Sequence, residues 1–225
     1  ANTMWYDERS NGRGYAHLGL AGSLAFPGGS MDENQAFFQT RPEARTASQW
    51  LDTGVILDAT SYQLGAIESV INIGSLQLVG EYMHISLQRE TGPDLAFHGG
   101  YFSLSYFLTG EHIPWSRDIG ILGRVTPHEN FFLLDTCDGH RGKGMGAWQV
   151  AARLSRADFS EHDVLGGVGH NLTLALNWFM NANTRMQFNY ILGRIDNRRT
   201  ALAAGGTAIV SGSYSILGTR FVIDF

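Results

Sequence analysis

Apolar and polar residues alternate with a period of two along most of the chain. In residues 97–109, Phe102, Leu104 and Tyr106 alternate with Ser103 and Ser105. Successive side chains of a β-strand point to opposite faces, so this pattern predicts strands with one apolar and one polar face. About nine segments show it, at residues 15–26, 35–41, 62–73, 76–83, 97–109, 144–159, 171–178, 185–194 and 214–225, and residues 3–8 would make a tenth.

The last of these segments places Leu217, Phe221, Ile223 and Phe225 on one face. Chain ends fray, so a soluble chain rarely ends on a large apolar residue directly after a half-apolar strand. A terminal Phe preceded by apolar residues at every second position resembles the assembly signal of bacterial outer-membrane β-barrels. The alternative is an ordinary C-terminal strand of a soluble sheet.

The lengths of the segments and of the connections between them favour transmembrane strands. Most of these segments have eight to thirteen residues, close to the roughly nine to eleven that a tilted transmembrane strand requires. Short turns alternate with longer polar loops, and Trp148, Trp178 and Tyr190 lie near strand ends, as in an aromatic girdle. No apolar run approaches the roughly 18 to 20 residues of a membrane-spanning helix. The sequence therefore predicts an all-β fold, an antiparallel transmembrane β-barrel of the outer-membrane type; a soluble all-β binding module is a weaker alternative.

Composition narrows the function. The 225 residues suit a single domain, and 28 glycines with 5 prolines suit strands and tight turns. The formal charge is −5 and Lys143 is the only lysine, which argues against a nucleic-acid surface. The single cysteine, Cys137, excludes an internal disulfide. The histidines match no metal-binding spacing and no catalytic Ser-His set is marked, so we expect no cofactor, no metal and no enzymatic activity.

Six ordered motifs carry a family resemblance. They are RPEARTASQWLDTG, GEYM, HGGYFSLSYFLTGEHIPW, GAWQVAARLSRADF, NLTLALNWFMNANTRMQFNYI and GTRFVIDF. Together they resemble the C-terminal part of the phosphate-selective porins of Gram-negative outer membranes, over roughly residues 37–225.

The resemblance implies a trimeric barrel of about sixteen strands that conducts anions and favours phosphate or polyphosphate. With nine or ten strands, residues 1–225 are expected to form one barrel domain or the C-terminal part of one, in a chain whose N-terminal portion is missing here. The implied partners are outer-membrane lipid, small anionic or polar solutes, and a homotrimer or neighbouring membrane proteins. One departure is that the family's phosphate-binding lysines have almost no counterpart, since Lys143 stands alone.

Arginines are the candidate anion-binding residues. Strict alternation puts Arg153, Arg185 and Arg220 on polar faces, and Arg45 follows the RPE motif. A guanidinium in lipid costs about 2 to 4 kcal/mol at mid-depth, so these side chains are expected to face the lumen. There they offer bidentate donors to anions. The alternative is that they pair with lumenal carboxylates, for which the candidates are Glu68, Glu81 and Asp224.

The longest connection covers residues 111–144. Counting strands back from a periplasmic C-terminus puts it on the periplasmic side, where short turns are usual. It contains apolar residues such as Trp115, Ile119 and Phe131, so we expect it to fold onto protein, into the lumen, with Arg117, Arg124 or Arg141 near the permeation path. The alternative is packing against a neighbouring protomer or a periplasmic partner. The expected function is a passive porin for small hydrophilic solutes in the outer membrane of a Gram-negative-type bacterium; the competing function is a non-conducting structural barrel.

Overall fold

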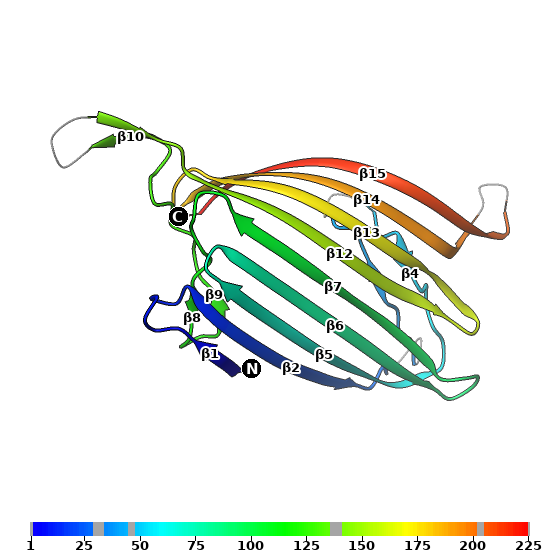
Figure 1. Ribbon diagram of the computed structural model, residues 1–225. Helices are drawn as coiled ribbons and strands as arrows, with labels where there is room; N and C mark the ends of the chain where they lie inside the picture. The colour runs from blue at the N-terminus through cyan, green and yellow to red at the C-terminus, as the bar shows by residue number, and fades with distance from the viewer. Residues whose placement is uncertain (1, 29–33, 45–47, 136–140, 202–204, 225) are drawn as a thin grey trace.

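The dominant feature is one large antiparallel sheet (Figure 1). The computed structural model describes residues 2–28, 34–44, 48–135, 141–201 and 205–224, without the side chains of Asn2, Leu133, Leu134, Asp135 and Arg141. Across these ranges nine strands make up the sheet, in the order β1-β2-β5-β6-β7-β12-β13-β14-β15. They are β1 (Asn2–Tyr6), β2 (Gly14–Ala25), β5 (Ala59–Ile73), β6 (Leu76–Arg89), β7 (Leu95–Phe107), β12 (Ala147–Glu161), β13 (Val164–Phe179), β14 (Thr184–Ala201) and β15 (Thr207–Ile223).

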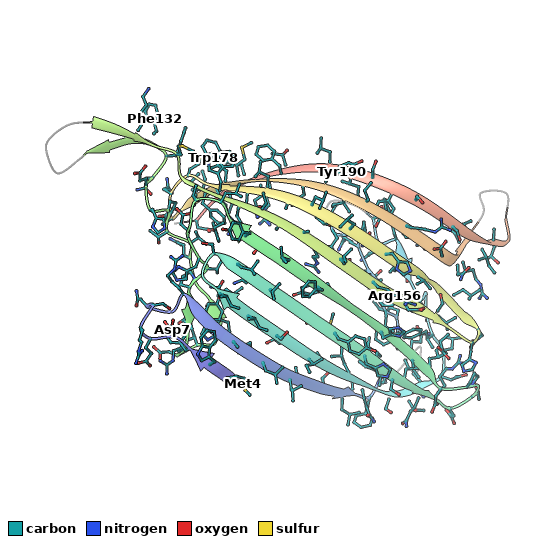
Figure 2. The ribbon with its side chains drawn as sticks, viewed as in Figure 1. Met4, Asp7, Phe132, Arg156, Trp178 and Tyr190 are labelled. Carbon is teal, nitrogen blue, oxygen red and sulfur yellow. The ribbon has the colours of Figure 1, made fainter. Side chains whose placement is uncertain are left out.

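The register gives the sheet an apolar and a polar face, as the alternation predicts. Leu174 stands opposite Tyr190 and Leu176 opposite Phe188, whereas Asn177 stands opposite Gln187. The apolar face, called the outer face here, is exposed along its length; Leu174, Leu217 and Phe221 are among its exposed side chains. Trp178 lies near one end of this face and Arg156 toward the other (Figure 2). The predicted facing of the strands is therefore confirmed.

The sheet is curved but not closed into a barrel. In the described ranges β1 pairs only with β2 and β15 only with β14, so one side of each is a free edge. No helix in these ranges is long and apolar enough to cross a membrane. The architecture is all-β and antiparallel, as expected for a porin.

The sheet has two distinct ends. The end that carries the C-terminus, the C-terminal end, bears the turns at 7–13, 74–75 and 180–183 and the long connection at 108–146. The opposite end bears the turns at 90–94 and 162–163, the end of β14 and the start of β15. It also bears the long connection from β2 to β5, called the 26–58 segment here, of which residues 26–28, 34–44 and 48–58 are described. Figure 1 shows the described part of this segment that contains β4 behind the sheet, on its inner face.

Residues 35–41 are not a strand of the main sheet, contrary to the sequence-based expectation. Only β3 (Gln39–Thr40) is extended there, and it pairs with β4 (Leu51–Asp52) in a separate ribbon. The alternating apolar residues of this segment pack inward: Ala36 is buried, and the ring of Phe38 lies 5.7 Å from that of Phe97. Its period of two therefore reflects docking on the inner face and not contact with lipid.

The inner face carries apolar clusters at both ends. At the opposite end Ile56 of the 26–58 segment joins Leu87, Leu95 and Phe97. At the C-terminal end Val125 of the long connection packs with Phe107, Ala147 and Phe179, and Trp115 packs with Tyr15 and Val70. Between these clusters the inner face is mainly polar.

The long connection divides into two parts. Its first part contains the ribbon of β8 (Trp115–Ser116) and β9 (Ile121–Leu122) and lies against the inner face near β1 and β2. Its second part is the hairpin of β10 (Phe132–Asp135) and β11 (Arg141–Gly144), which projects away from the sheet (Figure 1).

Candidate permeation site

Arg153 is a cation on the inner face that contacts two other elements. It lies on β12, opposite Ser103 of β7 and Thr173 of β13. Its guanidinium carbon lies 3.7 Å from the ring centroid of Tyr101, within cation–π range. Its Nε lies 3.2 Å from Glu43 Oε1, and its side chain is 38% exposed. The guanidinium is therefore fixed by contacts with two elements while part of it stays open.

Glu43 connects the 26–58 segment to the sheet. Its Oε1 accepts a hydrogen bond from Ser155 Oγ at 2.7 Å, and Ser155 Oγ accepts one from Asn171 Nδ2 at 3.3 Å. The hydroxyl of Tyr214 donates to Asn171 Oδ1. The chain of contacts thus runs from β12 across β13 to β15, and it positions the carboxylate that faces Arg153.

Two further contacts hold the same segment. The ring of Trp50 packs edge-on against Tyr214 at a centroid distance of 4.3 Å. Leu51 is buried over a glycine-rich part of β13, where a Cβ on Gly169 would lie 2.8 Å from Leu51 Cδ1. The glycine allows the segment to approach the sheet closely.

The segment and the sheet enclose a pocket of about 370 Å³. Its polar lining includes Arg153, Glu43, Ser155 and Asn171, and its apolar lining includes Trp50 and Leu51. A pocket with a partly open guanidinium can offer directed N–H donors to an anion. Glu43 competes for the same donors, so the charge of Arg153 is offset, while Arg41 adds a further cationic residue to the lining.

Arg185 and Arg220 also lie on the inner face, nearer the C-terminal end. Arg220 stands opposite Gln187, and Arg185 is the second residue before Gln187 on β14. A row of amides leads to Arg220 across the sheet, with Gln187 Nε2 donating to Asn177 Oδ1 at 3.1 Å and Asn177 Nδ2 donating to Gln149 Oε1 at 2.8 Å. Within the described ranges neither arginine is in an ion pair with a carboxylate. These two arginines form a second cationic position, separate from Arg153.

Of the remaining candidates, the structure places Arg117 and Arg124 away from this pocket. Arg45 lies outside the described residues, and so does the side chain of Arg141. Arg124 is exposed in the long connection at the C-terminal end. Arg117, in the same connection, pairs with Glu8 at 2.8 Å and lies 4.9 Å from the ring centroid of Tyr6.

Sequence reasoning missed the partner of Arg153. The expected carboxylates were Glu68, Glu81 and Asp224, whereas the structure supplies Glu43 from the segment between β2 and β5. Glu68 instead lies 3.4 Å from His17. The RPE motif marks the neighbourhood of Glu43, but alternation carries no information about a segment that is not a strand.

The comparisons with known proteins agree with this geometry. The family model for "Phosphate-selective porin O and P" matches residues 5–225. An uncharacterised protein of Caulobacter vibrioides (strain ATCC 19089 / CIP 103742 / CB 15) is 24% identical over 192 residues, which are 84% of this chain. The match spans 35% of that relative's length. The match to nearly the whole chain shows that the protein belongs to the phosphate-selective porin O and P family.

Proposed function

We propose that the protein forms a passive diffusion channel for small hydrophilic solutes in the outer membrane of a Gram-negative bacterium. Family membership implies that membrane, and the apolar outer face and polar inner face suit a barrel with lipid outside and water inside. Among the solutes we include anions such as phosphate or polyphosphate, and we propose a homotrimer as the assembly. The family is one of channels and not of enzymes.

The observation that carries this proposal is the placement of Arg153. It lies on the polar face of the sheet, in a pocket bounded by an inward-folded segment, with part of its guanidinium open. A cation so placed faces the water-filled path of a closed barrel. A few fixed charges dominate the field in a narrow pore with low-dielectric walls, so one such group can set charge preference.

The inner face suggests how an anion would move. Near the middle of the sheet it would exchange part of its water for donors of Arg153, while Glu43 keeps the binding weak enough for release. Arg185 and Arg220 then offer a second position toward the C-terminal end. Weak, successive sites permit conduction, because a solute must leave each site as readily as it enters. Transport is driven by the concentration gradient and uses no cofactor.

Conductance in planar bilayers tests the proposal. The full chain, refolded and inserted, is expected to give stepwise currents with a reversal potential that indicates anion preference. Arg153→Gln is expected to reduce that preference, since it removes the charge and keeps similar side-chain bulk. A correctly folded protein that carries no current rejects the channel.

A second function, a non-conducting structural barrel, is favoured by one specific observation. The 26–58 segment covers part of the inner face, and its residue Glu43 is already paired with Arg153. If the segment seals the lumen, the wild type is silent and only removal of its anchors opens a current. The same bilayer measurement therefore separates the two functions.

A further inference from the structure

The outer face changes from apolar to basic toward the opposite end of the sheet. One row across it reads Arg156 on β12, His170 on β13 and Arg194 on β14, each directly opposite the next. The next outward-facing row toward the C-terminal end is Leu154, Leu172 and Leu192. Basic side chains thus border the apolar surface, on the face that the proposed function turns toward lipid.

The two arginines are oriented by carboxylates of their own strands. Arg156 Nη2 lies 3.5 Å from Asp158 Oδ2, and Arg194 Nε lies 2.8 and 3.0 Å from the two oxygens of Asp196. Each pair uses one guanidinium nitrogen, and the arginine side chains remain 57% and 62% exposed. The carboxylates offset much of the net charge, so any ligand is attracted by directed N–H donors and by His170.

A shallow groove of about 830 Å³ runs beneath this row. Its polar lining on the outer face includes Arg156, His170, Arg194 and Ser213, its apolar floor includes Phe102, Leu154 and Leu192, and Glu81 of the inner face also borders it. These three floor residues are 51%, 58% and 42% exposed, so the groove is open to the surroundings. It combines an apolar surface with hydrogen-bond donors at one end.

The depth of the row matches the level of lipid headgroups. On β13, His170 lies eight residues from Trp178, which is about 26 Å along a strand and about 20 Å across a membrane at a tilt of about 40°. The apolar band of such barrels is about 25 Å tall and bordered by aromatic girdles. If Trp178 marks the periplasmic border, the Arg156 row lies near the outer border, where an exposed arginine is much less costly than at mid-depth. Figure 2 shows Trp178 and Arg156 toward opposite ends of the sheet.

We infer that this row and groove bind a phosphate-bearing lipid of the outer leaflet. The phosphate would accept hydrogen bonds from the guanidinium groups of Arg156 and Arg194, and an acyl chain would lie along the apolar floor. The directed N–H donors and the apolar groove below them favour this ligand over a second copy of the chain. A second copy would present the same basic row and no matching acceptors for the free donors of the arginines. The site rests on the proposed membrane location and not on conduction.

The test is lipid retention by the full chain reconstituted in phosphatidylcholine vesicles with or without bisphosphorylated lipid A. After detergent extraction, native mass spectrometry counts bound lipid. We expect lipid A to be retained in preference to phosphatidylcholine, and the double variant Arg156→Gln/Arg194→Gln to weaken that retention at least about ten-fold, equivalent to about 1.4 kcal/mol. The variant Arg156→Lys/Arg194→Lys keeps the charge but loses the planar guanidinium geometry. Its retention of lipid A should lie between that of the wild type and that of the double Gln variant.

Arg153→Gln is the matched control, because Arg153 lies on the same strand but on the inner face. It should retain lipid A like the wild type. Equal retention by the double Gln variant, or equal loss in the Arg153 variant, overturns the proposal. Loss of an oligomer in the double variant without loss of lipid A also overturns it, because the row is then a protein interface.

If the double Gln variant does not fold, its heat-modifiable gel mobility shows this. In that case the retention of phosphorylated and of dephosphorylated lipid A by the wild type is compared, and equal retention of the two forms overturns the site. A silent channel with selective lipid retention rejects the proposed conduction and keeps this site.

Discussion

Arg153 takes its surroundings from three elements that are far apart in sequence. Its strand sets which face it occupies, Tyr101 of the neighbouring strand covers the guanidinium, and Glu43 of the 26–58 segment supplies the carboxylate. Both charges lie close together in a partly enclosed site, where the interaction is stronger than at an open surface. The electrostatic character of this position therefore depends on both residues.

Replacing Glu43 by Gln tests that dependence. The amide oxygen can still accept the hydrogen bond from Ser155, but the negative charge beside Arg153 is lost. We expect the reversal potential in a salt gradient to shift toward the anion limit, and inorganic phosphate to block chloride current at lower concentration. Planar-bilayer recordings measure both quantities.

Glu90→Gln is the control for net charge, because Glu90 is exposed in the turn between β6 and β7. It should shift the reversal potential much less, since solvent and salt screen an exposed charge. Equal shifts in the two variants would mean that Glu43 acts only through total charge.

Asp163 provides a pH-dependent contact in the turn between β12 and β13. Its two carboxylate oxygens accept hydrogen bonds from Arg89 at 2.7 and 2.9 Å, and this pairing lowers the pKa of Asp163 to about 2. The ordinary value for an unfolded chain is about 3.9, so the contact stabilises the turn above that pH and is lost as the pH falls from about 4 to about 2. The carboxylate is exposed, so salt should weaken the effect.

A carboxyl NMR titration of Asp163 checks this expectation. The midpoint should lie near the lowered pKa in the wild type and return toward the ordinary value in Arg89→Gln. Asp94→Asn, which changes a neighbouring turn carboxylate, should leave the low midpoint in place. An Asp163 midpoint that is the same with and without Arg89 contradicts the pairing.

At the scale of elements, the 26–58 segment is fixed to the inner face by packing. Leu51 is buried over the glycine-rich part of β13, and Ile56 joins the apolar cluster of the opposite end. Gly167 has φ +97°, and a Cβ there would lie 3.0 Å from Leu51 Cδ2. Side chains on this part of β13 would hold the segment away from the sheet.

Leu51→Ala should loosen the segment, because large-to-small changes at buried sites cost about 2 to 5 kcal/mol. Leu57→Ala is the matched control, since Leu57 belongs to the same segment but is 59% exposed. We expect faster limited proteolysis within the segment, larger conductance and noisier current only for the Leu51 variant. Wild-type protease resistance in that variant would show that Leu51 is not an anchor.

The placement of the long connection at 108–146 can also be tested by conductance. Trp115 lies 5.7 Å from Tyr15 and 4.5 Å from His17 between ring centroids, and its Nε1 donates to Thr3 Oγ1 at 2.9 Å. Phe132 is exposed in the projecting hairpin. If the first part of the connection narrows the lumen, Trp115→Ala should raise single-channel conductance whereas Phe132→Ala should not. The lumenal placement is wrong if neither variant changes the conductance of a folded protein.

The sequence predicts the strands and their facing but not the inserted segment. A strict period of two is enough to predict that Leu174, Leu176 and Phe188 face outward. A shift of the strand register by one residue would turn every apolar side chain inward. The same rule placed Arg153 on the inner face. It failed at residues 35–41, where Ala36 and Phe38 alternate because they pack on the inner face, and it gave no partner for Arg153, because Glu43 lies in a segment without periodic structure.

At the scale of the whole molecule, the free edges of the sheet conflict with a lipid environment. Backbone N–H and C=O groups that find no partner in the hydrocarbon each cost several kcal/mol, so spanning sheets must be closed. The outer face of β15 is apolar toward the C-terminal end, where Leu217 is 79% and Phe221 55% exposed. This strand is therefore suited to lipid on its face but not on its edge.

The last prediction concerns these edges in the membrane. We expect β1 and β15 to pair with further strands, of the same polypeptide or of another copy, because closure is the only arrangement that satisfies their backbone groups. Hydrogen exchange of the inserted full-length protein should then show the amides of β15 as protected as those of β6, which is paired on both sides. The informative amides are those of β15 that point away from β14. Fast exchange at these positions in a conducting protein, with β6 still protected, would show that the channel works with an open edge and would overturn the closed barrel.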